Sequence, residues 1–201
     1  MKLRSFLLAA AAAAGVAAVA ADFDPMEAPF AENLARPEVP ARAADAVRAA
    51  MQPLRNVLNT AGYAVSDHRG GTVLCVTIPA AKLFAPNTTT LRDNAALLLR
   101  PLWPYIQRSD NYKVLIAVHS DDTGDSTYSD RLTGARAEAI DDFYYQLNNS
   151  TDTDIVPYGL GRDEPLGANN SLRGREKNRR VEVYFVPTQN FIDKARRNRG
   201  R

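Results

Sequence analysis

The chain has 201 residues, of which 45% are hydrophobic and 24% are charged, and its formal net charge is +2. These values are typical of a globular protein with one main domain and some additional chain. A single cysteine excludes a disulfide scaffold and a cysteine-rich zinc module. The sequence has no second long apolar run after its N-terminal one, which excludes a protein that crosses a membrane several times.

Residues 1–21 have the composition of a secretory signal peptide. Lys2 and Arg4 form a basic start, an apolar run follows, and small residues end it before Asp22. We predict that this leader is removed on export, with an uncleaved membrane anchor as the alternative. No cysteine stands at the end of the run to accept a lipid anchor. Without the leader, 23 basic residues remain against 23 acidic ones, a balance that gives no general case for binding nucleic acid.

The next two segments differ in character. Residues 22–40 contain four prolines among acidic and small residues, and we expect a linker or an extended arm that holds no helix. Residues 41–71 read as a helical lead-in followed by the start of a β-hairpin. Apolar residues recur at helical spacing over 41–61, and Pro53 is expected to kink or restart that helix.

Strands and helices then alternate over residues 72–187. Strands are predicted over 72–78, 112–119, 155–158 and 181–186, and helices over 89–107, 127–147 and 172–178. The two long helices should face the sheet with Leu91, Ala95, Leu98 and Leu102 and with Leu132, Ala135, Ala139, Phe143 and Leu147. This alternation predicts an α/β (α+β) two-layer sandwich with helices on one face of the sheet. Residues 188–201 form a basic tail, predicted as a solvated end or as a contact for anionic polymers or membranes.

The densest polar segment is His-Ser-Asp-Asp-Thr-Gly-Asp at 119–125, where a buried strand is predicted to end. A loop there can present carboxylates to a cation or an ammonium group, and a plain polar turn is the alternative. Asp122-Thr123-Gly124 spells the triplet of a retroviral-type aspartic protease, but the acidic Asp125 does not suit the apolar cleft of that enzyme. Calcium-loop spacing, a set of zinc ligands, a serine-hydrolase elbow and a P-loop lysine are all missing from the sequence. We therefore expect a noncatalytic protein without a metal or a cofactor.

Asp121 has a possible partner in Arg136, which follows 15 residues later on the next predicted helix. If the helix folds back from the loop, the two side chains can face each other across a small pocket. A carboxylate and a guanidinium held a few ångströms apart form a receptor for a zwitterion. The alternative is a plain ion pair that fixes the helix and contributes little at a surface.

Five segments that occur in order carry a family resemblance. They are Phe84 with Leu91, 119–124 (HSDDTG), 132–137 (LTGARA), 159–161 (GLG) with Pro165, and 174–183 (GREKNRRVEV). Together they resemble the OmpA C-terminal domain family, which includes peptidoglycan-associated lipoproteins and MotB-type stator domains. The resemblance covers roughly residues 72–187 and implies a βαβαβ core with a mixed sheet that binds peptidoglycan noncovalently.

The resemblance also implies site residues. In family members that bind peptidoglycan, an aspartate in the strand-end loop and an arginine in the next helix hold the diaminopimelate of the stem peptide. The matching positions are Asp121 and Arg136, and the loop amides that usually assist fall on Asp122, Thr123 and Gly124.

Two further positions match near the C-terminal end of the domain. The resemblance implies that Asn178 organises a loop beside the pocket and that Arg179 is an additional site residue. The sequence departs from the family pattern at Val118, where glycine is often found, and at Arg162, where glutamate is often found. Neither departure removes the two principal site residues.

We therefore predict a periplasmic protein of the Gram-negative envelope that anchors the outer membrane or an envelope partner to the cell wall by recognising diaminopimelate. Residues 22–71 are expected to contact an outer-membrane or envelope protein. The alternative is a structural or assembly subunit that uses the same fold for protein contacts and binds little peptidoglycan. An open pocket between Asp121 and Arg136 favours the first interpretation, and a closed ion pair between them, sealed by Tyr128, favours the second.

Overall fold

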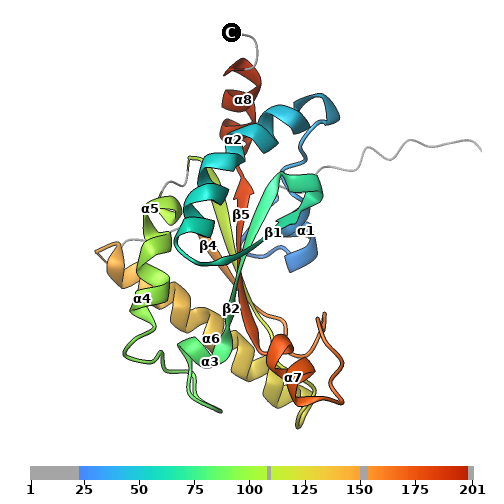
Figure 1. Ribbon diagram of the computed structural model, residues 1–201, viewed down its shortest axis with the longest axis vertical. Coiled ribbons are helices and arrows are strands. Elements are labelled where there is room, and N and C mark those ends of the chain that lie inside the picture. The colour runs from blue at the N-terminus through green and yellow to red at the C-terminus, as the bar shows by residue number, and fades with distance from the viewer. Residues whose placement is uncertain (1–22, 108–109, 150–153, 199–201) are drawn as a thin grey trace, which may run out of the picture.

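The computed structural model describes residues 23–107, 110–149 and 154–198. The predicted signal peptide and the last three residues of the basic tail lie outside the described residues. Figure 1 shows a central sheet with α2 (Ala41–Thr60) and α8 (Gln189–Asn198) at one end of the molecule and α3 (Ala80–Leu83) and α7 (Leu172–Asn178) at the other.

Five strands form one mixed sheet in the order β1-β2-β5-β3-β4. Their bounds are β1 Ala64–His68, β2 Val73–Pro79, β3 Tyr112–Val118, β4 Ile155–Gly159 and β5 Arg180–Pro187. Neighbouring strands are antiparallel except for β3 and β4, which are parallel. The predicted hairpin is confirmed, since β1 and β2 join through a short 3-10 turn, η1 (Arg69–Gly71). The sheet confirms the predicted α/β class and places the last strand of the chain in its centre.

The helical lead-in forms one continuous helix, α2, which buries Ala43, Val47, Met51, Leu54 and Leu58. A predicted restart at Pro53 was wrong, because α2 continues through that residue. Gly62 follows the helix with φ +84°, a left-handed conformation that glycine adopts without strain.

The helix predicted over 89–107 was wrong in its first part. Residues before Ala96 form turns, and Leu91 pairs with Phe84 in an isolated β-bridge. The remainder is divided into three short pieces: α4 (Ala96–Leu99), η2 (Arg100–Leu102) and α5 (Trp103–Ile106). Pro101 and Pro104 stand in the first turns of η2 and α5 and cannot donate a helical hydrogen bond, which explains the division.

The long helix α6 (Ser126–Leu147) was predicted correctly in extent but not in orientation. Its buried positions are Ser129, Thr133, Arg136, Ala137, Ile140 and Tyr144, whereas the predicted inward residues are only partly buried. Gly159 of β4 explains the difference, because a Cβ atom built on it would lie 2.2 Å from the backbone nitrogen of Gly134. Helix and strand thus meet backbone to backbone, and the large apolar side chains are displaced to the flanks.

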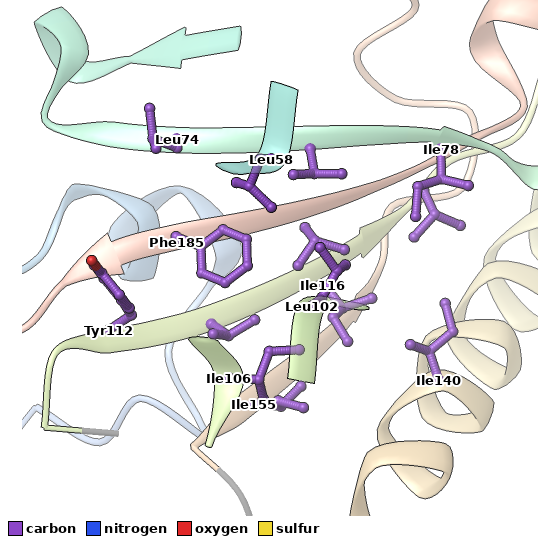
Figure 2. Packing of buried hydrophobic residues seen from close by; sticks show 14 of the residues in the cluster. Leu58, Leu74, Ile78, Leu102, Ile106, Tyr112, Ile116, Ile140, Ile155 and Phe185 are labelled. Atoms are coloured by element: carbon purple, nitrogen blue, oxygen red, sulfur yellow. The ribbon is translucent and has the colours of Figure 1, made fainter. Parts of the chain in front are cut away.

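The larger core fills the side of the sheet that the main helices cover. Figure 2 shows how helix residues pack on strand residues such as Phe185. The helix residues are Leu58 of α2, Leu102 of η2, Ile106 of α5 and Ile140 of α6. α8 completes this layer beside α2 with the buried Ile192 and Ala195, so most of the predicted tail is an ordered helix. None of the helices in the described ranges has both the length and the apolar character needed to cross a bilayer.

A second, smaller core lies on the opposite face of the sheet, and the N-terminal segment covers it. The expectation that residues 22–40 hold no helix was wrong, because α1 (Phe30–Ala35) forms there. Phe30 packs edge-on against the rings of Tyr158 and Tyr184 at 5.3 and 5.5 Å. Other members of this core are Val73, Cys75, Leu115, Ala117, Val156 and Val186. The sheet is therefore covered on both faces, chiefly by helices on one and by this single short helix on the other.

Side-chain donors attach the N-terminal segment to the sheet. Lys113 Nζ of β3 donates to the carbonyl oxygens of Asn33 (2.8 Å) and Arg36 (2.9 Å). Arg69 donates to those of Leu34 (3.1 Å) and Pro37 (2.7 Å). These bonds satisfy backbone carbonyls in the last turn of α1 and directly after it, so this segment packs as part of the folded unit.

Candidate binding site

The candidate site lies at one end of the sheet, where an end of each of four strands is found. Pro79 at the end of β2 pairs with Arg180 at the start of β5, and Val118 at the end of β3 lies opposite both Val181 and Gly159. The segments beyond these ends are α3, the polar loop after β3 and the end of α7. They surround a cavity of about 450 Å³ whose lining includes Phe84, Ala85, Ser120, Asp121, Thr123, Tyr128, Ser129, Arg136 and Arg179.

Asp121 is 6% exposed and makes two strong contacts. Its Oδ1 accepts a hydrogen bond from the backbone nitrogen of Thr123 at 2.9 Å, and its Oδ2 forms an ion pair with Arg179. Burial by itself raises the pKa of the Asp121 carboxyl, but the hydrogen bonds from Thr123 and the Arg179 guanidinium outweigh it and hold the pKa below its ordinary value. Asp121 is therefore an anion at neutral pH.

Arg136 is also 6% exposed, and backbone oxygens hold its side chain. Its Nε donates to the carbonyl of Thr88 at 2.8 Å, and one terminal nitrogen donates to that of Ala85 at 3.1 Å. The guanidinium carbon lies 4.9 Å from the ring centroid of Phe84, a cation–π contact. Burial lowers the pKa of Arg136, yet a guanidinium remains a cation at any physiological pH. Across the described part of the chain, no carboxylate forms an ion pair with it.

The structure thus brings Asp121, Thr123, Arg136 and Arg179 to one cavity, and the closed Asp121–Arg136 ion pair that the sequence left open as an alternative does not form in the described structure. Asp122 and Gly124 are exposed in the same loop but are not among the lining residues. Gly124 has φ +86°, which suits the turn of that loop.

Asn178 lies beneath the neighbouring loop, fully buried. Its Oδ1 accepts a hydrogen bond from the backbone nitrogen of Gly167 at 2.8 Å, and its Nδ2 donates to the Gly167 carbonyl and to Asn169 Oδ1 at 2.9 and 2.7 Å. An amide used in this way holds a loop and has no donor left for a ligand. The predicted role of Asn178 as a loop organiser agrees with these contacts.

Sequence reasoning missed a buried charged network directly below the polar loop. Glu182 of β5 accepts hydrogen bonds from Arg180 Nε at 2.8 Å and from the Tyr184 hydroxyl at 2.8 Å, and it lies 3.1 Å from His119 Nε2. Burial raises the pKa of Glu182, but its partners, His119 first, outweigh this and bring the pKa to about 2. The signal was present in the sequence, since residues 180, 182 and 184 alternate and must share one face of a strand.

This network supports the site from below. The backbone nitrogen of His119 donates to the carbonyl of Arg180 at 2.9 Å, which joins the start of the polar loop to the start of β5. Arg179 directly precedes Arg180, and Asp121 lies two residues after His119 on the other segment. The described residues contain no group of three His, Cys, Asp or Glu side chains placed to hold a metal ion.

The chain is similar in sequence to two curated proteins that are named as lipoproteins. The chain is 29% identical over 107 residues to the outer-membrane lipoprotein YfiB of Pseudomonas aeruginosa, a match that covers 53% of this chain and 62% of the relative. It is 26% identical over 127 residues to the probable lipoprotein YiaD of Escherichia coli, covering 63% and 57% of the two chains. The matched region therefore spans about 60% of the length of these two relatives.

Solved structures give the same fold. The cell wall anchor of the T6SS from Pseudomonas aeruginosa superposes with a TM-score of 0.55 at 27% identity, covering 68% of this chain and 96% of that one. A MotB-like protein from Desulfovibrio vulgaris superposes with a TM-score of 0.62 at 23% identity, covering 72% and 93%. Residues 83–179, which contain the whole polar loop and Arg136, match the sequence profile of the OmpA family. This stretch of the chain is therefore similar to the OmpA family, in agreement with the resemblance that the sequence motifs carry.

Proposed function

We propose that the cavity binds peptidoglycan by holding the diaminopimelate of a stem peptide between Asp121 and Arg136. The observation that carries this proposal is one cavity lined by a buried anion and a buried cation that are not paired with each other. The free end of diaminopimelate is a zwitterion, with an ammonium and a carboxylate on one carbon. Asp121 receives the ammonium, and Arg136 receives the carboxylate.

Asp121 and Arg136 each have unused hydrogen-bonding capacity for this ligand. A carboxylate accepts about four hydrogen bonds, so the ligand ammonium shares Asp121 with Thr123 and Arg179. Arg136 uses Nε and one terminal nitrogen on backbone carbonyls, which orients the guanidinium before a ligand arrives. Its remaining N–H groups are available to a carboxylate, and a fixed guanidinium loses little conformational entropy on binding.

We further propose that the protein is exported to the periplasm and is noncatalytic. It anchors the outer membrane or an envelope partner to the wall, and residues 22–71 provide contacts to that partner. The names of two relatives support this role: one is an outer-membrane lipoprotein, and the other is the cell wall anchor of a secretion system. A small zwitterion offers few atoms, so the affinity of one site is modest. Many weak sites along a polymeric wall are sufficient for anchoring.

The test is cosedimentation of the protein without residues 1–21 with sacculi that contain diaminopimelate. The wild type is expected to pellet with the sacculi, and Asp121→Asn and Arg136→Gln are expected to remain in the supernatant. Matched controls are Asp122→Asn in the same loop and Arg131→Gln on the same helix, both exposed and outside the cavity lining. Circular dichroism melts of each variant separate loss of binding from loss of folding.

A wild type that stays in the supernatant contradicts the proposal and favours the assembly-subunit interpretation. Equal loss in the variants and in the matched controls also contradicts it, because binding would then depend on overall charge. The addition of soluble L-Ala-γ-D-Glu-diaminopimelate is expected to release the pelleted wild type.

A further inference from the structure

We propose that the binding cavity continues into a second lobe, where Arg92 and Lys82 receive another carboxylate of the same stem peptide. This inference rests on the proposed function and deepens it, because it names a second feature of the ligand that the protein recognises. The lobe is a shallow cavity of about 460 Å³. It shares Ala81 and Arg92 with the cavity that contains Asp121 and Arg136, so the two lobes adjoin at these residues, and together we call them the groove.

Arg92 stands at the junction of the two lobes on a well-anchored backbone. Its own nitrogen donates to the carbonyl of Leu83 at 2.8 Å, and the neighbouring Leu91 pairs with Phe84 in a β-bridge. Phe84 is the ring beneath Arg136. α3, which carries Lys82, is in turn attached to the site, since the nitrogen of Ala80 donates to the carbonyl of Arg179 at 2.9 Å. The two lobes therefore share one rigid support.

The charge of the groove calls for an anionic ligand. Its lining contains the cations Arg136, Arg179, Arg92 and Lys82 against the single carboxylate Asp121. Arg179 is paired with Asp121, and a bound zwitterion adds no net charge. Arg92 and Lys82 are exposed, and throughout the described ranges neither forms an ion pair with an acidic side chain.

A stem peptide carries the required charge. Next to the zwitterionic end of diaminopimelate it has the α-carboxylate of its γ-linked D-glutamate and the carboxylate of its C-terminal end. Both belong to the same short peptide as the zwitterion, and the C-terminal carboxylate is the nearer of the two along the covalent chain. A partly exposed pair of this kind contributes modestly, so we expect the second lobe to change affinity about two- to fivefold.

The experiment measures affinity by titration calorimetry for three forms of L-Ala-γ-D-Glu-diaminopimelate. One has both carboxylates free, one has the glutamyl α-carboxylate as an amide, and one has the C-terminal carboxylate as an amide. All three keep the zwitterionic end. The wild type is expected to bind one amide two- to fivefold more weakly than the free peptide, and that amide identifies the carboxylate.

Arg92→Gln is the decisive variant. It is expected to bind the free peptide as weakly as the wild type binds the discriminated amide, and to lose the discrimination; Lys82→Gln shows a smaller change in the same direction. Arg100→Gln, an exposed arginine outside both lobes, should keep the wild-type pattern. Equal binding of all three peptides by the wild type, or discrimination that survives in Arg92→Gln, overturns the second lobe and leaves the proposed function standing. Failure of the wild type to bind any of the three overturns the proposed function itself.

Discussion

Asp121 forms its ion pair with Arg179, the residue directly before β5, while Arg136 on α6 is held by the backbone carbonyls of Ala85 and Thr88. The two charges that line the cavity are thus fixed by separate parts of the fold. Neither has to break an ion pair with the other before the proposed zwitterion enters. This arrangement makes Arg179 a regulator of the Asp121 charge, which can be tested by titration.

Arg179→Gln is expected to raise the pKa of the Asp121 carboxyl. The variant lacks the guanidinium that lowers this pKa, whereas burial, which raises it, remains. Binding needs the ionised carboxylate. The wild type should therefore keep its affinity as the pH falls to about the ordinary aspartate value of 3.8, whereas the variant should lose affinity at a higher pH. Carbon-13 NMR titration of the Asp121 carboxyl checks the pKa directly. An unchanged pKa in Arg179→Gln would show that Arg179 does not control this charge.

Glu182→Gln tests the buried network below the site. Folding lowers the pKa of this carboxyl from 4.5 to about 2. A carboxyl with a lowered pKa stabilises the fold above its unfolded pKa, and this contribution is lost as the pH falls from about 4.5 toward 2. The shift corresponds to roughly 3 kcal/mol. Urea unfolding at pH 7 should show a loss of this order in the variant, together with a weaker pH dependence below 4.5. A loss under 0.5 kcal/mol would contradict the assigned role.

Phe30→Ala tests whether the N-terminal segment is part of the folded unit. The ring is buried between Tyr158 and Tyr184, so its removal is expected to cost about 3 kcal/mol of unfolding free energy. Affinity for the stem peptide should not change, since α1 packs on the other face of the sheet from α6. Met26→Ala is the matched control, because that side chain is 63% exposed. Similar unfolding free energies for both variants would mean that the segment is only loosely attached.

Two glycine substitutions should have opposite effects. A methyl group on Gly159 would meet the backbone of Gly134 at 2.2 Å and force α6 away from β4, so Gly159→Ala should lose at least 2 kcal/mol and weaken binding through Arg136. A methyl group on Gly134 meets nothing within 4 Å, so Gly134→Ala should be neutral or should stabilise the helix by up to about 1 kcal/mol. Thermal melts compare the stabilities of the two variants with that of the wild type. Equal destabilisation of both variants would contradict the described contact between α6 and β4.

The strands and α7 could be predicted from the sequence because their signals are local. Alternation, β-branched residues and glycine turns depend on neighbours along the chain. The inward face of α6 could not, since apolar spacing says nothing about a close approach between Gly134 and Gly159. α1 was missed for a related reason. Its stability comes from Phe30 and from donors on β3 and η1, which are distant in sequence.

The candidate site also depends partly on local signals and partly on contacts between residues distant in sequence. Asp121 and Arg136 could be placed near one pocket because they lie on consecutive elements. The pairing of Asp121 with Arg179 depends on strand order, which brings the start of β5 beside the end of β3. Strand order results from packing of the whole sheet, and no local pattern encodes it.

Strand order also has a consequence for how the protein is made. β5 is the last of the five described strands in chain order, yet it occupies the middle of the sheet between β2 and β3. Until it inserts, those two strands have no shared partner and their facing edges are open to other chains. Arg179 directly precedes β5 and is positioned together with it. The nascent chain therefore completes its central sheet and the lining of the cavity in the same folding event.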